Sequence, residues 1–111
     1  MTKKRMRVSV ALVALELIEY TLRIGGYKHQ SDWFATAPTN ALVKRGFAEK
    51  IDEHGVVMAT DSLYSAFGFP NEPRFCQLKS QLTDELNWGA DRQIVFTVNE
   101  AGQWRIAEAA S

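Results

Sequence analysis

The sequence contains a single cysteine, Cys76, and only two histidines, His29 and His54, among its 111 residues. One thiol cannot form an internal disulfide bond or supply a cysteine-rich zinc site by itself. Both histidines fall in expected loops, without the i,i+4 or cysteine partners that a metal site needs. We therefore predict no metal site and a reducing compartment. Cys76 is expected on a helix as a buried, inert thiol.

Patterns that mark catalytic centres are also missing. No nucleophile-elbow pattern surrounds a serine, and the sequence has no glycine-rich phosphate loop. Glu16 and Glu19 stand one helical turn apart, as paired catalytic carboxylates could, but an exposed helix face explains them more simply. The sequence therefore predicts a protein that is not an enzyme and uses no cofactor.

The sequence has no apolar run of the roughly 20 residues that span a bilayer. A basic N-terminus precedes a hydrophobic stretch, as in a signal peptide. However, Glu16 and Glu19 interrupt that stretch, and no convincing cleavage site follows it. We expect a cytoplasmic protein that does not interact with a membrane.

What the sequence does contain is typical of one globular domain. Hydrophobic residues make up 46% and charged residues 23%, and three Trp, six Phe and three Tyr can anchor a core. The net charge is zero, but residues 1–50 hold nine Lys or Arg against four acids, and residues 51–111 hold four against nine. This asymmetry indicates either a side that faces a polyanion or two halves that neutralise each other across the fold.

Hydrophobic spacing and chain-breaking residues predict the elements of the first half. A helix over 8–24 has its apolar stripe at Val8, Ala11, Leu12, Leu15, Ile18 and Leu22, and Gly25-Gly26 ends it. Two short helices follow, over 32–35 and about 37–45, separated by a tight corner, and Gly46 ends the second. Residues 47–51 and 56–60 form a β-hairpin around the turn 52–55.

The second half is expected to begin with a short helix over 63–67, preceded by Asp61-Ser62 as a cap. A longer helix follows, with Pro73 in its first turn and Gly89 as its stop, and with an apolar stripe at Phe75, Leu78, Leu82 and Leu86. Strands 94–98 and 104–106 form a second hairpin, which either extends the first sheet or forms a separate one.

The passage from Thr39 to Ile51, followed by Gly55-Val56-Val57 and Thr60, resembles the segment from recognition helix to wing in the winged helix-turn-helix family. Members of that family commonly show a Leu-x-x-Arg-Gly-Leu/Phe pattern, a charged strand, a turn and an aliphatic strand that ends in Thr. The resemblance implies an α+β fold: a winged helix-turn-helix-like region over 1–70, with a C-terminal helix and β-hairpin extension over 71–111 that belongs to the same compact domain.

The resemblance also implies a transcriptional regulator that binds double-stranded DNA, expected as a homodimer because one short helix rarely reads enough sequence. Its base or phosphate contacts would be Thr39, Asn40 and Lys44. Its further phosphate contacts would be Arg45 and Lys50, together with a flexible basic arm of Lys3, Lys4, Arg5 and Arg7.

Two features do not favour DNA binding. Lys44 and Arg45 could simply complement the dipole at the end of a helix. The expected wing tip carries Asp52 and Glu53, where a wing that grips DNA usually offers cations.

The alternative hypothesis is a protein-binding adaptor or inhibitor, encoded by a mobile genetic element, that uses the winged helix as a scaffold. Its aromatic anchors would be Trp88, Trp104 and Phe69, unless these side chains belong to the core.

Overall fold

The computed structural model describes residues 2–28, 33–53, 55–87 and 92–107, without the side chains of 27, 28 and 33–37. The predicted partner contact Trp88 lies outside the described residues, as do the expected loop residues His29 and His54, Asp32 and the helix stop Gly89. The fold is mixed α+β, as predicted. Its described elements are β1 (Thr2–Arg7), α1 (Val8–Ile24), β2 (Tyr27–Lys28), α2 (Trp33–Lys44), β3 (Ala48–Lys50), β4 (Val56–Ala59), α3 (Asp61–Phe67), α4 (Pro73–Asn87), β5 (Gln93–Val98) and β6 (Trp104–Ile106).

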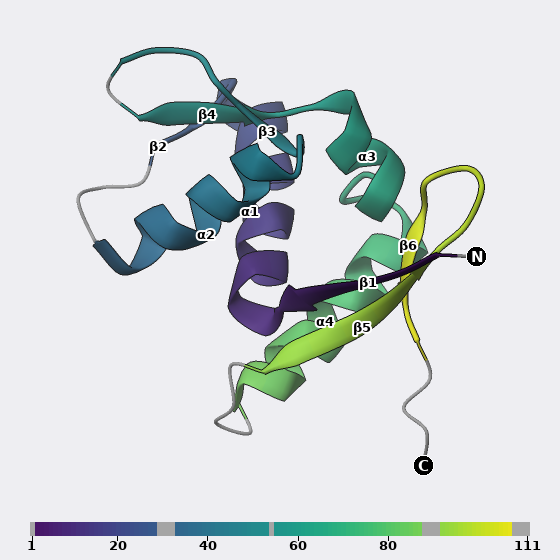
Figure 1. Ribbon diagram of the computed structural model, residues 1–111. Coiled ribbons are helices and arrows are strands. Elements are labelled where there is room, and N and C mark those ends of the chain that lie inside the picture. The colour runs from purple at the N-terminus through teal and green to yellow at the C-terminus, as the bar shows by residue number, and fades with distance from the viewer. Residues whose placement is uncertain (1, 29–32, 54, 88–91, 108–111) are drawn as a thin grey trace.

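Helix α1 runs through the centre of the molecule and contacts α2, β4 and α4 (Figure 1). Of its predicted stripe, Val8, Ala11, Leu15 and Ile18 are buried, Leu12 is partly buried and Leu22 is 52% exposed. Val10, Ala14 and Leu17 are buried as well, because α1 is covered from more than one side. Gly25 ends the helix in the left-handed conformation and donates its N–H to the carbonyl of Thr21, as the sequence predicts.

The first hairpin is present, and β2 joins it in a sheet of order β2-β4-β3. At its turn, the Asp52 carboxylate accepts the N–H of Val56 at 3.0 Å. At its base, the Thr60 hydroxyl donates to the carbonyl of Gly46 at 2.6 Å. The acid at the tip and the threonine at the end of this hairpin therefore both have structural roles in closing it.

The prediction of two short helices before this hairpin is wrong. A single helix, α2, runs from Trp33 to Lys44 with Pro38 inside it. Proline removes one helical hydrogen bond, but Pro38, Thr39 and Leu42 are all buried. Packing of these residues stabilises α2 across the proline, where local sequence signals predicted a corner.

The expectation of a flexible basic arm is also wrong. Residues 2–7 form β1, which pairs antiparallel with β5 in a second sheet of order β1-β5-β6, so the C-terminal hairpin does not extend the first sheet. Met6 is buried opposite Ile94, and Lys4 lies opposite the buried Phe96. The alternation of apolar and polar residues fixes this register. Residues from both expected regions, 1–70 and 71–111, thus share one sheet.

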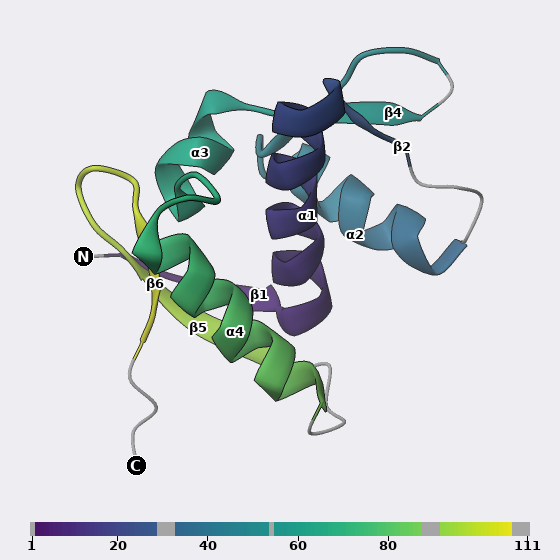
Figure 2. The same cartoon turned by 180° about the vertical axis from the view of Figure 1, so that it is seen from behind.

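The β1-β5-β6 sheet has one covered and one open face. The side chains of Met6, Ile94, Phe96 and Trp104 point into the core, where α4 packs behind the strands, as Figures 1 and 2 show from opposite sides. Strand alternation places Lys3, Arg5, Arg7 and Arg105 on the opposite face, where all four are exposed. In Figure 1 this open face and α2 both lie toward the viewer, whereas α4 lies on the far side.

Four aromatic side chains form a cluster in the core. Trp104 lies 5.3 Å from Phe47, 5.8 Å from Phe67 and 5.4 Å from Phe96, measured between ring centroids. It is only 9% exposed. The hypothesis that Trp104 anchors a protein partner is therefore wrong, because its ring completes the core.

Helix α4 buries Phe75, Leu78 and Leu82 of its predicted stripe, whereas Leu86 is 42% exposed. Cys76 was expected to be buried but is exposed, with its thiol 3.4 Å from the carbonyl oxygen of Pro70. The position next to Phe75 turns away from a stripe that repeats every three or four residues. None of the described helices has the length and apolarity to cross a bilayer.

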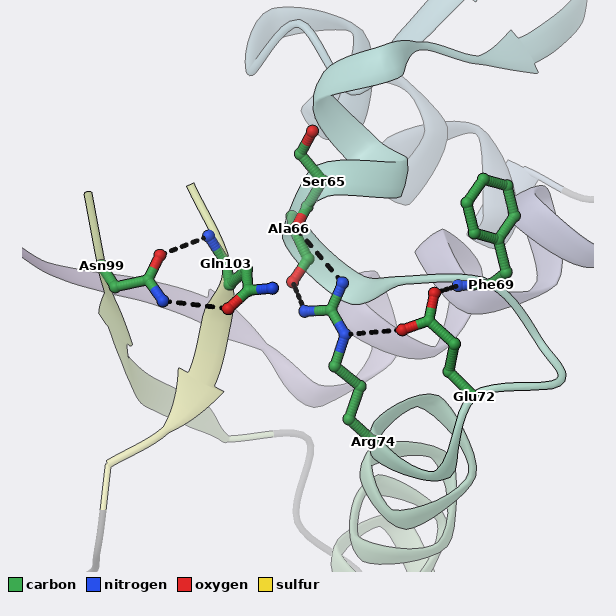
Figure 3. A network of polar contacts seen from close by, with 7 residues as sticks. All are labelled: Ser65, Ala66, Phe69, Glu72, Arg74, Asn99 and Gln103. Carbon is green, nitrogen blue, oxygen red and sulfur yellow. Dashed lines mark hydrogen bonds and ion pairs between the residues drawn. The ribbon is translucent and has the colours of Figure 1, made fainter. Parts of the chain in front are cut away.

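Arg74 holds the corner between α3 and α4 (Figure 3). Its guanidinium donates to the Glu72 carboxylate at 3.1 Å and to the carbonyls of Ala66 and Ser65 at 3.4 and 3.5 Å. The second oxygen of Glu72 accepts the N–H of Phe69 at 3.1 Å. This network satisfies carbonyls at the end of α3 and fixes the start of α4.

Candidate nucleic-acid interface

The exposed side of α2 offers two of the three predicted side chains. Asn40 and Lys44 are exposed and stand four residues apart, on one face of the helix. Thr39 is 7% exposed and lies on the buried side with Leu42, so its predicted contact with DNA bases is wrong. Successive residues of a helix are rotated by about 100°, so Thr39 points toward the core while its neighbour Asn40 points outward.

Arg45 follows the last residue of α2 and connects this helix to β1. Its guanidinium Nη2 donates to the carbonyl oxygen of Arg5 at 2.6 Å and lies 5.8 Å from the ring centroid of Trp104. Its backbone N–H continues the helical pattern by donating to Ala41. The contact with Arg5 brings the end of α2 beside the outer edge of β1.

The open face of the second sheet gathers cations from strands that are far apart in the sequence. Lys3 lies opposite Thr97, and Thr97 lies opposite Arg105, so these three residues form one row across the sheet. Arg5 and Arg7 continue the basic surface along β1, with about 6.6–6.8 Å between alternate residues. None of the strand positions on this face, which also include Gln93 and Val95, holds an acid.

One of the ion pairs between described residues increases the charge asymmetry of the sequence. Arg74 pairs with Glu72, Arg92 with Glu85, and Lys79 with Glu19. The last pair crosses the halves, but it uses an acid of the basic half and a cation of the acidic half. Lys3, Lys4, Arg5, Lys44 and Arg45 form no ion pair with any described residue. These five cations therefore remain available to an external anion.

Lys50, a predicted phosphate contact, is exposed on β3 beside the exposed Glu49. It belongs to the β2-β4-β3 sheet, whereas the basic residues of β1 belong to the other. At the turn of the hairpin, Glu53 is exposed and Asp52 is engaged with Val56. The structure thus joins Arg45, which follows Lys44 in the chain, to β1, and leaves Lys50 on a strand with an acidic neighbour.

A surface pocket of about 530 Å³ lies where α2, α3, β1 and the β5–β6 turn meet. Lys4, Arg45, Ser62 and Ser65 line it together with Asp61 and Trp104. Burial raises the pKa of the Tyr64 hydroxyl, and the negative charge of Asp61 raises it further. Sequence reasoning missed Ser62, Ser65 and Arg105 as site residues, because only the β1–β5–β6 register and the contact of Arg45 with β1 bring them to this region.

Of the anchors predicted for a protein partner, Phe69 alone is both described and exposed. It is 43% exposed and stacks on Tyr64, with 4.9 Å between the ring centroids. Trp104 is buried, and Trp88 lies outside the described residues.

Comparison of the chain with protein-family models, with curated proteins and with solved structures finds no match.

Proposed function

We propose that this chain is a small DNA-binding domain of the winged-helix type that acts in transcription regulation, without catalysis and without a cofactor. The observation that carries the proposal is the set of five cations, on β1 and at the end of α2, that have no ion-pair partner among the described residues. Duplex DNA is a polyanion, and phosphate contacts supply most of the affinity of such domains.

The order of elements supports the winged-helix part of the proposal. Helix α1 is followed by β2, by α2 packed on α1, and by the hairpin β3–β4, which forms one sheet with β2. In this arrangement α2 is the recognition helix. Asn40 and Lys44 are exposed polar side chains in the part of α2 whose side chains are described; asparagine suits an adenine edge, and Lys44, the last residue of the helix, is assigned to a phosphate.

A single readout side chain, Asn40, distinguishes few base pairs, so most of the affinity is expected to be independent of sequence. Five phosphate contacts predict that the logarithm of the affinity falls with the logarithm of the salt concentration, with a slope of about −4 to −5. Specific regulation would then require a homodimer that places two such helices on one site.

Fluorescence anisotropy with a labelled duplex of about three helical turns tests the proposal. The wild type is expected to bind at 50 mM salt and to lose affinity steeply toward 200 mM. Lys44→Gln and Arg5→Gln should each weaken binding and reduce the salt slope by about 0.9. Lys79→Gln is the matched control, because Lys79 is an exposed lysine already paired with Glu19.

Absence of duplex binding by the wild type at 50 mM salt contradicts the proposal. An equal effect of Lys79→Gln and Lys44→Gln contradicts the assigned surface, because the affinity would then follow net charge alone.

A second candidate function is protein binding, as an adaptor or inhibitor. The exposed stack of Phe69 on Tyr64 favours it, since aromatic rings are common centres of interfaces. This hypothesis expects one stoichiometric partner that is retained after nuclease treatment, lost with Phe69→Ser and unaffected by Lys44→Gln. The opposite pattern for the two variants favours DNA binding.

A further inference from the structure

Several side chains with hydrogen-bond donors line the pocket between α2, α3 and β1. Lys4 comes from β1, Arg45 from the end of α2, and Ser62 and Ser65 from α3. Ser62 and Ser65 stand three residues apart and therefore share one face of that helix. Cationic and hydroxyl donors from three elements thus line one surface pocket.

Arg45 is held in place before any ligand arrives. One Nη2 hydrogen is used by the carbonyl of Arg5, and the guanidinium plane lies near the ring of Trp104. A guanidinium has five N–H donors, and the rest of them have no acceptor among the described residues. A fixed group with spare donors loses little conformational entropy when it binds an anion.

The other donors of the pocket are available as well. Neither the ammonium of Lys4 nor the hydroxyls of Ser62 and Ser65 form a hydrogen bond or ion pair with a residue that the structure describes. Asp61 lines the same pocket, but it forms no ion pair with Lys4 or Arg45. With two cations and one carboxylate, the pocket has a formal charge of +1.

We propose that this pocket binds one phosphodiester group. The proposal rests on the proposed DNA-binding function and names the place where one backbone phosphate is held. A phosphodiester carries a single negative charge and offers only acceptor oxygens to the donors of the pocket, so it matches the charge of +1. A phosphate monoester carries up to two charges, and Asp61 would repel the second.

Substitutions of neutral and acidic pocket residues separate this site from general attraction by charge. The double variant Ser62→Ala/Ser65→Ala should weaken duplex binding at least about fivefold, because hydrogen bonds to a charged group are lost. Its salt slope should not change, because no charge is removed. Asp61→Asn should strengthen binding. Ser80→Ala, an exposed serine on α4, is the matched control and should have no effect.

Nuclear magnetic resonance with small probes distinguishes the source of the phosphate. Dimethyl phosphate, a diester, should shift the backbone amides of Ser62, Ser65 and Gly102, which line the pocket, whereas sodium chloride of equal ionic strength should not. If the wild type binds no duplex but dimethyl phosphate shifts these amides, the DNA-binding function fails while the pocket remains a site for a small phosphodiester.

Two results overturn the proposal. The first is an equal duplex affinity of the wild type and Ser62→Ala/Ser65→Ala. The protein would then bind DNA, but the pocket would hold no phosphate of it. The second is a set of amide shifts that inorganic phosphate produces and dimethyl phosphate does not, which contradicts the diester preference.

Discussion

Replacement of Gly68 by alanine tests the α3–α4 corner at one atom. Gly68 ends α3 with φ 85° and ψ −168°, a backbone region that residues with a Cβ almost never adopt. An added Cβ would lie 2.9 Å from Nε of Arg74, 3.0 Å from its Nη2 and 3.0 Å from Oε2 of Glu72. The substitution therefore strains the backbone and displaces the side chains that join α3 to α4.

The costs of backbone strain and of side-chain displacement can be added as order-of-magnitude free energies. Backbone strain in this region costs about 1–3 kcal/mol. Displacement of Arg74 weakens its bonds to Glu72 and to the carbonyls at the end of α3, at a cost of about 1 kcal/mol, because both side chains are partly exposed. Gly68→Ala should thus lower the free energy of unfolding by about 2–4 kcal/mol, and the melting temperature by roughly 10–15 °C.

Urea denaturation followed by circular dichroism measures this loss, with Gly25→Ala as the matched control. Gly25 also ends a helix, at φ 84° and ψ 0°, but an added Cβ would meet no atom within 4 Å. The control should lose only about 1 kcal/mol, the cost of a left-handed conformation for an L-residue. Equal losses for Gly68→Ala and Gly25→Ala would refute the reasoning. Arg74→Ala should also cost less in the Gly68→Ala background than in the wild type.

Two further predictions concern the core and acid stability. Leu42→Asp should unfold the domain, because Leu42 is 0% exposed and a carboxylate there would be buried without a partner. The control Leu86→Asp, at a 42% exposed position, should fold. A Leu42→Asp protein that is soluble and unfolds cooperatively would contradict the inward orientation of Leu42. The hydrogen bond from the Phe69 N–H, and then the one from Arg74, lower the pKa of Glu72 below its ordinary 4.5. Glu72→Gln should therefore be less stable than the wild type at pH 7. This difference in stability should shrink as the pH falls below about 4.5 and through the lowered pKa of the folded state. A difference in the urea midpoint that does not depend on pH would contradict the role of the charge.

Features of the fold that depend on a few neighbouring residues could be predicted from the sequence. Gly25 and Gly46 adopt positive φ angles at helix ends, as a residue without a Cβ can at little cost. The turn between β3 and β4 and the apolar faces of α1 and α4 follow from the spacing of residues that are close in the chain. These signals are local, so one sequence suffices to read them.

The errors share a different physical origin, which is packing between distant segments. Pro38 indicates a helix start by its local chemistry, but burial of the surrounding residues continues α2 through it. Residues 2–7 have the composition of a solvated arm, and they form a strand because they pair with the edge of β5. The surroundings of Trp104 and Thr39 likewise depend on elements that the local sequence does not identify.

The candidate site was predictable in residue type but not in arrangement. The excess of cations in the first half is visible in the sequence, and Lys44, Arg45 and the basic residues of β1 were all identified. Their connection through Arg45 and the carbonyl of Arg5 requires a contact between residues that are 40 positions apart. Arg105 joins the basic face only through the β1–β5–β6 register.

The pairing of β1 with β5 also has a consequence for how the chain folds. Thr2 lies opposite Val98, so this pair closes a loop that contains nearly the whole sequence. Closing a long loop has an entropic cost that local hydrogen bonds do not repay, and such contacts slow folding. During synthesis on the ribosome, β1 must therefore wait for its partner strand while α1, α2 and the first hairpin can already assemble. The basic surface is completed only when the last strands have emerged.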